Sequence, residues 1–181
     1  MTGIRPCAEE DFKSIYLVIN EAAVAYRDVI PPDCWREPYM SEDELRREIA
    51  EGVCFFAFEE EGVLIGVMGI QHVRDVSLIR HAYVLPSRQR LGIGGRLLSA
   101  LCRQTDQPIL LGTWADATWA VHFYEKYGFK SVPLGEKDGL LRTYWHISRR
   151  QIATSVVLAD QRWFELKRAS GAGHQAPGNK G

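Results

Sequence analysis

Residues Val84 to Leu98 read VLPSRQRLGIGGRLL and carry the most structural information in this sequence. An apolar run ends, a basic loop rich in glycine follows, and apolar residues at helical spacing then begin. This order predicts a strand, a loop and the start of a helix. Free backbone N–H groups at a helix start attract anions, and glycine lets a phosphate approach the backbone closely. The segment therefore predicts an anion-binding loop, with positive charge added by Arg88, Arg90 and Arg96.

Two common phosphate-binding motifs do not fit this loop. The Walker motif G-x-x-x-x-G-K-[ST] is absent, and the dinucleotide fingerprint G-x-G-x-x-G lacks its third glycine because Leu97 stands there. The pattern Q/R-x-x-G-x-G/A does fit, with Gln89, Gly92 and Gly94. In this respect the sequence resembles the pyrophosphate-binding motif of the GNAT superfamily of acyl-CoA-dependent N-acyltransferases. The alternative is a glycine-rich turn that only changes the direction of the chain.

The segment Ala120–Phe129, AVHFYEKYGF, supports the same resemblance. It is similar to the later GNAT helix and turn, which usually end in fYekxGF. Family helices commonly begin with Asn seven positions before the Tyr, whereas this chain has Ala117 there. Thr113 or Thr118 could instead supply that contact to the pantetheine arm. The resemblance covers roughly residues 4–134 and is specific in its second half.

Periodicity along the rest of the chain predicts alternating helices and strands. From residue 78 onward, strands alternate with helices, which indicates parallel pairing with right-handed crossovers. The fold class is therefore α/β, with a mixed central sheet that has an antiparallel N-terminal part, parallel central strands and helices on both faces. Helices are expected over 9–26, 41–50, 94–103 and 117–127, and strands over 53–58, 63–73, 78–85, 108–113, 129–134 and 153–158.

Length and composition indicate one ordinary globular domain. The chain has 181 residues, of which 46% are hydrophobic and 25% charged, and this is enough for a sizeable core. We expect residues 1–169 to form a GNAT-like acyltransferase domain. Residues 170–181 contain no apolar side chain larger than Ala and cannot offset their own ordering entropy. They are therefore expected to be a disordered tail.

The composition also argues against several classes of partner. The formal net charge of -1 gives no basic excess that would indicate nucleic acid or an anionic membrane. No apolar run reaches the roughly 18 residues of a membrane span, and the N-terminus lacks the apolar stretch of a secretory signal. The four cysteines are far apart, which favours reduced thiols, and no Cys–His cluster has zinc spacing. We expect a cytoplasmic protein that uses no metal.

The GNAT resemblance implies acetyl-CoA as the acyl donor, with the pyrophosphate of CoA held by the glycine-rich loop. In this family an amine attacks the thioester carbonyl directly, and the CoA thiolate leaves. The resemblance assigns polarisation of the carbonyl to the backbone N–H of Val84 or a neighbour, and protonation of the sulfur to Tyr124. The residues implied in cofactor binding are Tyr83, Val84, Gln89, Arg90, Leu91, Gly92, Ile93, Gly94, Gly95, Arg96 and Tyr124.

Both candidate catalytic side chains have a structural alternative. Tyr124 shares helical spacing with Ala120, Phe123 and Tyr127, so it could be a core aromatic residue. His81 lies in the strand just before the loop, and histidine titrates in the range that suits deprotonating an ammonium group directly or through water. A lone histidine in a strand is more often simply hydrogen-bonded, and many GNAT enzymes use only ordered water.

The acceptor site is expected outside these motifs, in residues 26–39 and 140–146. Both segments carry aromatic or charged side chains that suit an amine, although they suit an anchored surface loop equally well. We expect transfer to the primary amine of a small molecule. A protein or peptide N-acetyltransferase and a non-catalytic acyl-CoA-binding sensor are the alternatives, and a homodimer stays open. The candidate acceptor-binding residues are Tyr26, Trp35, Tyr39 and Tyr144.

Overall fold

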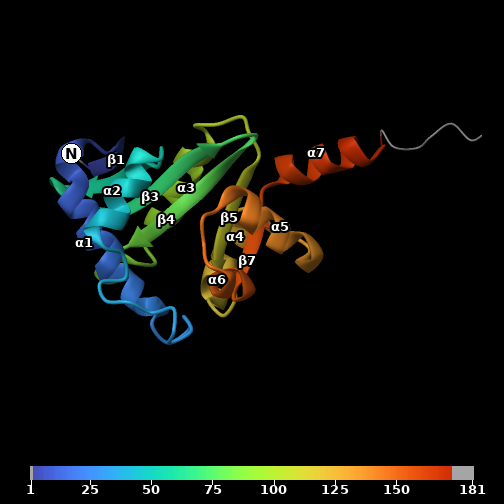
Figure 1. The fold of residues 1–181 in the computed structure, drawn as a ribbon. Coiled ribbons are helices and arrows are strands. Elements are labelled where there is room, and N and C mark those ends of the chain that lie inside the picture. Colours follow the sequence, from blue (N-terminus) through green and yellow to red (C-terminus); the bar gives the residue numbers. More distant parts are fainter. Residues whose placement is uncertain (1, 173–181) are drawn as a thin grey trace, which may run out of the picture.

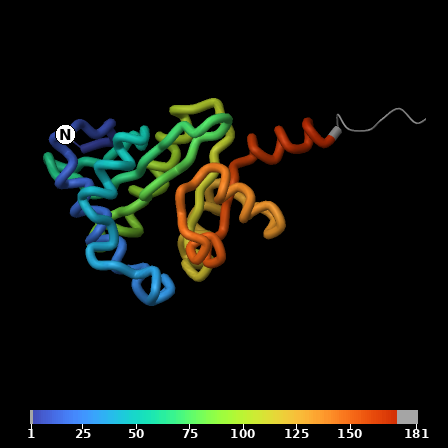
Figure 2. The backbone as a smooth tube through the Cα atoms, in the orientation of Figure 1, coloured from blue at the N-terminus to red at the C-terminus, as the bar shows by residue number. Residues whose placement is uncertain are grey.

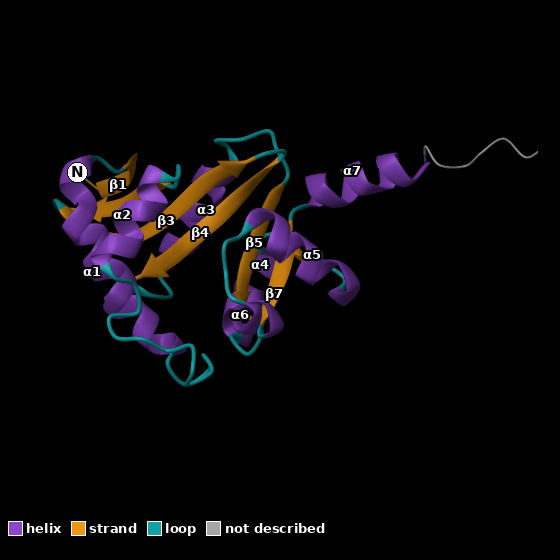
Figure 3. Ribbon diagram, viewed as in Figure 1, coloured by secondary structure: helices purple, strands orange, loops and turns teal. Residues whose placement is uncertain are grey.

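The structure, a computed structural model, describes residues 2–172 and is built on a seven-stranded sheet in the order β1-β2-β3-β4-β5-β7-β6 (Figures 1 and 3). The strands are β1 (Thr2–Pro6), β2 (Cys54–Glu60), β3 (Val63–Val73), β4 (Val76–Val84), β5 (Ile109–Trp114), β6 (Lys130–Ser131) and β7 (Ser155–Ala159). The helices are α1 (Phe12–Ala23), α2 (Glu42–Ala50), α3 (Ile93–Cys102), α4 (Thr118–Lys126), α5 (Leu134–Tyr144), α6 (Arg149–Ala153) and α7 (Gln161–Ala172). Three short 3-10 segments are η1 (Glu9–Asp11), η2 (Val24–Tyr26) and η3 (Pro86–Arg88).

Helices cover both faces of the sheet, as the sequence predicts. Successive side chains of a strand point to opposite faces. Ile79 and Leu111 pack into one apolar cluster with α3 and α4, whereas Leu78 and Leu110 pack into another with α5, α6 and α7. The helices α1 and α2 form a third cluster against β2 and β3. The mixed sheet with helices on both faces confirms the expected fold class.

The strands β4 and β5 pair over only part of their length. Their parallel pairing covers Ser77 to Ile79 on β4 and ends at the pair Ile79–Leu111. Beyond it, β4 continues to Val84 against β3, and β5 continues to Trp114 against β7. The two strands therefore separate, and Figure 2 shows the green β4 and the yellow β5 diverging. This gap between β4 and β5 positions the candidate site.

The expected run of parallel strands after residue 78 is wrong in its pairing. β4 and β5 are parallel, but β7 lies antiparallel between β5 and β6. The reason is the segment between β6 and β7, which holds two helices and returns the chain beside β5. The expected strand over 129–134 is reduced to Lys130–Ser131 because Pro133 precedes the start of α5 at Leu134. Proline lacks the N–H that a ladder needs.

Several elements were not expected from periodicity. The strand β1 and the helices α5, α6 and α7 belong to this group. Gly135 and Gly139 weaken the helical pattern of α5, because glycine is a poor helix former. Helix α7 includes residues 170–172, which were expected to belong to the disordered tail, and residues 173–181 lie outside the described residues. No helix within residues 2–172 is long and apolar enough to cross a bilayer.

Candidate active site

The loop between β4 and α3 has the backbone geometry of an anion site. Gly92 precedes α3 with a φ of 76°, which glycine adopts at little cost, and Arg90 has a φ of 64°. The N–H of Arg96 donates to the carbonyl of Gly92 at 3.0 Å. Within the described chain, the N–H groups of residues 93–95 have no backbone acceptor. They lie at the positive end of the helix dipole and can bind an anion.

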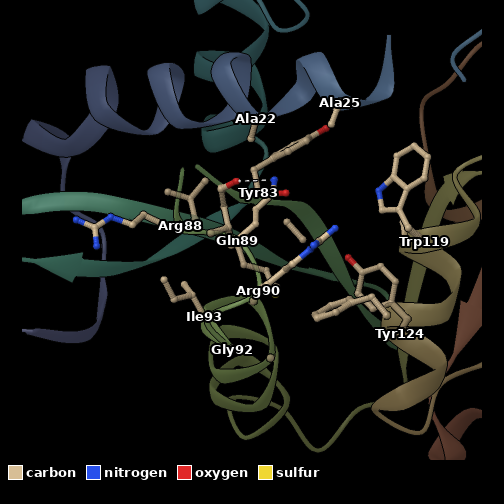
Figure 4. A pocket seen from close by; sticks show the side chains of 18 of the residues that line it. Ala22, Ala25, Tyr83, Arg88, Gln89, Arg90, Gly92, Ile93, Trp119 and Tyr124 are labelled. Atoms are coloured by element: carbon tan, nitrogen blue, oxygen red, sulfur yellow. Dashed lines mark hydrogen bonds between the residues drawn. The ribbon is translucent and has the colours of Figure 1, made fainter. Parts of the chain in front are cut away.

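A cleft of about 830 Å³ lies beside this loop, between α3 and α4 (Figure 4). In Figure 4, Arg90 extends from the loop into the same space that Trp119 and Tyr124 enter from α4. We call it the α3–α4 cleft. A long ligand whose anionic group is bound by the loop could place the rest of its length in this cleft. The predicted cofactor residues that line it are Tyr83, Val84, Gln89, Arg90, Gly92, Ile93, Gly94, Gly95 and Tyr124.

Two members of the predicted cofactor set do not line this cleft. Leu91 is 63% exposed on the outside of the loop. Arg96 turns toward β2, where its guanidinium carbon lies 4.7 Å from the ring centroid of Phe58. Arg88 does line the cleft, but its guanidinium pairs with Glu60 at 3.1 Å. The positive charge that faces the cleft from this loop is therefore that of Arg90.

α4 and the residue after it contribute a wall of the cleft that was not predicted from the sequence. Trp119, Phe123, Lys126 and Tyr127 line the cleft, and their spacing of about one helical turn is a signal that could have identified them. The side chain of Tyr127, the residue after α4, packs directly on Gly95 of α3, which has no side chain. A Cβ atom at Gly95 would lie 1.8 Å from the hydroxyl oxygen of Tyr127. A side chain at position 95 would therefore displace Tyr127 from this wall of the cleft.

The strand β4 offers a backbone donor at the gap. Leu85 N–H donates to the carbonyl of Ile65 on β3 at 2.9 Å. Neighbouring backbone groups of a strand point to opposite sides, so the N–H of Val84 points away from β3. The Val84 carbonyl accepts from Gln89 Nε2 at 3.2 Å, which agrees with this orientation. The N–H of Val84 can therefore donate to a ligand atom where β5 has separated from β4.

A second cleft, of about 670 Å³, opens on the opposite face of the sheet. We call it the polar cleft, because ten of its side chains can carry charge. α2, the end of β4, the end of β5 and the segment from α5 to α6 form its walls. Tyr26, Ala82, Tyr83 and Tyr124 line both clefts, so the two clefts meet at the gap between β4 and β5. The ten side chains are Asp33, Arg36, Asp43, Glu44, Arg47, Glu48, Arg80, His81, His146 and Arg150.

The predicted acceptor residues separate into two groups. Tyr26 and Tyr39 line the polar cleft, and both contact the ring of Tyr83, with centroid distances of 6.0 and 6.4 Å. Trp35 lies behind Tyr39, stacked at 5.6 Å, and lines neither cleft. Tyr144 is directed away, and its hydroxyl donates to Asp75 at 2.7 Å.

Tyr144 does not reach the polar cleft because of its angular position on helix α5. Leu141 and Trp145 turn toward the polar cleft, so the intervening Tyr144 points elsewhere. Asp75, its partner, precedes β4 and thus lies at the end of that strand remote from Val84. Within residues 140–146, the side chains that line the polar cleft are those of Leu141, Trp145 and His146. Trp114 at the end of β5 lines it as well.

Tyr124 combines both interpretations that the sequence left open. It is 8% exposed and contacts the rings of Phe123 and Phe129 at 5.0 and 5.9 Å. It nevertheless lines both clefts, and its hydroxyl has no hydrogen-bond partner among the described residues. Burial, and to a lesser extent the neighbouring Tyr26, raises the pKa of Tyr124 well above its usual value. The phenol therefore keeps its proton near neutral pH.

His81 lies in the polar cleft at an irregular position of β4. It has a φ of 50°, and its Nε2 bonds to a carboxylate oxygen of Glu48 on α2. This partner lies 33 positions earlier and could not be recognised from the sequence pattern. No cluster of His, Cys, Asp and Glu that could hold a metal ion occurs within residues 2–172.

The sequence profile described as the acetyltransferase (GNAT) domain matches residues 17–146. The chain belongs to the GNAT acetyltransferase family. It is therefore an acyltransferase, and the resemblance, the fold class and the enzyme class predicted from the sequence are confirmed. No protein with a curated description matches the chain. The roles of individual site residues in this GNAT enzyme stay predictions.

Solved structures share the GNAT fold with this chain at low sequence identity. The PaiA N-acetyltransferase from Thermoplasma acidophilum, in complex with coenzyme A, is 18% identical with a TM-score of 0.66, over 88% of this chain and 98% of its own. The ribosomal-protein-S18-alanine N-acetyltransferase from Escherichia coli is 18% identical with a TM-score of 0.64, over 88% and 93%. N-acetylglutamate synthase from Neisseria gonorrhoeae, complexed with coenzyme A and N-acetyl-glutamate, is 19% identical with a TM-score of 0.61, over 90% and 35%.

Proposed function

We propose that this GNAT enzyme transfers the acetyl group of acetyl-CoA to the primary amine of a small molecule by direct attack. The observation that carries the proposal is the meeting of the two clefts at the gap between β4 and β5. A donor in the α3–α4 cleft and an acceptor in the polar cleft would bring their reacting atoms together there. Such positioning is a large part of the rate enhancement in bimolecular group transfer.

The α3–α4 cleft suits the donor. The N–H groups of residues 93–95 and the side chain of Arg90 provide the positive potential that a pyrophosphate requires. The apolar side chains of Met68, Phe123 and Trp119 suit the less polar remainder of an acyl-CoA molecule. Coenzyme A is present in two of the structures described above, which share the fold.

The chemistry balances with groups that lie at the gap. The lone pair of a neutral amine attacks the thioester carbon, and the negative charge that develops on the carbonyl oxygen is stabilised by the N–H of Val84. Collapse of the tetrahedral intermediate re-forms the C=O bond and breaks the C–S bond. His81 in the polar cleft first takes one proton from the acceptor ammonium, and Tyr124 later donates its proton to the leaving sulfur. The nitrogen of the intermediate releases its second proton, which restores the phenol of Tyr124 through solvent.

The size and closure of the polar cleft favour a small acceptor over a polypeptide. Its volume of about 670 Å³ lies in the range of small-molecule sites. Arg150 of α6 bonds to Asp33 at 2.9 Å, and Trp114 donates to the hydroxyl of Tyr39 at 3.4 Å. These contacts tie the segment after η2 to the other half of the molecule across the cleft. A long peptide would have to break them to reach the gap.

The test is a thiol-release screen with acetyl-CoA and a panel of polyamines, amino acids, aminoglycosides and peptides. The mass of each product should increase by one acetyl group. The proposal expects a small amine as the best acceptor. A peptide that is accepted better than every small amine would favour a protein N-acetyltransferase. Tight binding of acetyl-CoA without thiol release for any amine would favour a sensor.

A further inference from the structure

The adjacent side chains of Arg80 and His81 converge on one carboxylate. Arg80 Nη2 lies 3.0 Å from Oε1 of Glu48, and His81 Nε2 bonds to Oε2 of the same side chain. In a regular strand two neighbouring side chains point to opposite faces and could not meet in this way. The convergence on Glu48 therefore requires a local departure from strand geometry.

A bulge in β4 provides this departure. The register of β3 and β4 pairs Gly69 with Arg80 but Val67 with Tyr83, so His81 and Ala82 together face one residue of β3. The φ of His81 is 50°, a left-handed conformation that costs a residue other than glycine about 1–3 kcal/mol. Its ring stacks on Phe55 with a centroid distance of 6.0 Å. Contacts to Phe55 and Glu48 hold the imidazole in this orientation.

The carboxylate of Glu48 is itself fixed by a chain of hydrogen bonds. Arg80 Nη1 donates to Gln71 Oε1 at 2.8 Å, and Gln71 Nε2 donates to the carbonyl of Glu51 at 3.1 Å. This chain joins β3 and β4 to the C-terminal end of α2. The side chain of Glu48 is 13% exposed, so neither its position nor its charge is set by bulk solvent.

The charge on Glu48 follows from its partners. Burial alone would raise the pKa of Glu48, but the hydrogen bond from His81 and the charges of His81, Arg80 and Arg47 lower it below its usual value. Glu48 is therefore ionised near neutral pH, and its carboxylate accepts a hydrogen bond from the Nε2–H of His81. A neutral imidazole with its proton on Nε2 carries its free lone pair on Nδ1. The partner of His81 thus selects the nitrogen that can take up a proton.

We propose that Glu48 is a positioning residue that fixes the tautomer and orientation of His81 as the base for the acceptor amine. The inference rests on the proposed function. Nδ1 of His81 accepts one proton from the acceptor ammonium, and the amine then attacks with its free lone pair. The proton later passes to solvent, so Glu48 stays ionised throughout. The other titratable side chains that line the polar cleft with this pair are Tyr26, Asp33, Cys34, Arg36, Tyr39, Asp43, Glu44, Arg47, Arg80, Tyr83, Tyr124, His146 and Arg150.

The experiment compares Glu48→Ala and Glu48→Gln with His81→Asn and a control, Glu42→Gln. Asn tolerates the left-handed backbone of position 81, so His81→Asn removes the imidazole without adding strain. Glu42 is a carboxylate on the same helix that lines neither cleft. The readouts are kcat, the KM for acetyl-CoA, the pH profile of kcat/KM, and the ¹⁵N signals of the His81 ring.

We expect Glu48→Ala to lower kcat about 10- to 100-fold with little change in the KM for acetyl-CoA. The acidic limb of the profile should change in the Glu48 variants, because they alter or remove the hydrogen-bond partner of the His81 ring. The ring signals should show loss of the single Nε2–H tautomer, and His81→Asn should abolish the limb. Glu42→Gln should match the wild type.

The inference is overturned if the Glu48 variants lose only thermal stability while the limb and the ring signals stay unchanged. Glu48 would then be a structural ion-pair partner. A wild-type protein that acetylates no amine contradicts the proposed function and, with it, the role of His81 as a base. An active wild type with wild-type behaviour of His81→Asn leaves acetyl transfer from acetyl-CoA to an amine in place and contradicts the role of His81 as the base, and with it the inference.

Discussion

The replacement Tyr124→Phe separates the catalytic from the structural role of this residue. It keeps the ring, which contacts Phe123 and Phe129, and removes only the hydroxyl. The hydroxyl has no hydrogen-bond partner among the described residues, so no intramolecular bond is lost. The stability of folding should therefore change by no more than about 0.5 kcal/mol.

The expected catalytic effect of Tyr124→Phe is much larger than its effect on stability. General acid catalysis typically contributes roughly 10²–10⁴-fold, and a CoA thiolate is a tolerable leaving group because its pKa is about 8.5, near that of free cysteine. We therefore expect kcat to fall by roughly 10- to 10³-fold, which corresponds to about 1.4–4 kcal/mol of lost transition-state stabilisation. The KM for acetyl-CoA should change little.

The assay is steady-state thiol release with saturating amine, combined with thermal unfolding. Tyr144→Phe is the matched control, because that hydroxyl does donate a hydrogen bond, to Asp75 at 2.7 Å, and lies outside both clefts. It should cost about 0.5–1.5 kcal/mol of stability and leave kcat unchanged. If Tyr124→Phe keeps full kcat and lowers the melting temperature, Tyr124 is a core aromatic residue and solvent protonates the sulfur.

Three further outcomes follow from the geometry. Gly94→Val should weaken acetyl-CoA binding at least about 10-fold in calorimetry, since a Cβ atom there would already lie 3.4 Å from the ring of Phe123. The control Gly3→Val, in open space, should not change the affinity, and equal affinities of the two variants would refute the loop assignment. Tyr39→Ala should raise the acceptor KM and leave that for acetyl-CoA unchanged; the reverse would mean that the acceptor lies elsewhere. Because the folded-state pKa of Glu48 is lowered, its stabilisation is present above pH 4.5 and is lost as the pH falls further; denaturant midpoints for Glu48→Gln should show a weaker acid loss.

The loop could be predicted from the sequence because its signal is local. Gln89, Gly92 and Gly94 lie within six residues, and the strand before them and the helix after them are both periodic. A glycine at the start of α3 and free N–H groups in its first turn follow from these residues alone. Which basic side chains face the cleft was less predictable. Arg96, for example, lies on the side of α3 that faces Phe58 and does not line the cleft.

The acceptor side could not be predicted in the same detail, because it depends on contacts between distant segments. Nothing in the sequence pattern distinguishes Tyr144, which bonds to Asp75, from the adjacent Trp145, which lines the polar cleft. The pairing of His81 with Glu48 depends on a bulge that periodicity does not reveal. The place of β7 between β5 and β6 depends on how two unpredicted helices return the chain.

The most direct measurement for the central claim is the initial velocity of thiol release over a matrix of acetyl-CoA and amine concentrations, with the best amine of the panel. Two clefts that meet at the gap between β4 and β5 allow both substrates to bind at once. Direct attack within such a complex predicts double-reciprocal lines that intersect. Parallel lines, together with an acetylated enzyme trapped in the absence of amine, would indicate a covalent intermediate and contradict the account.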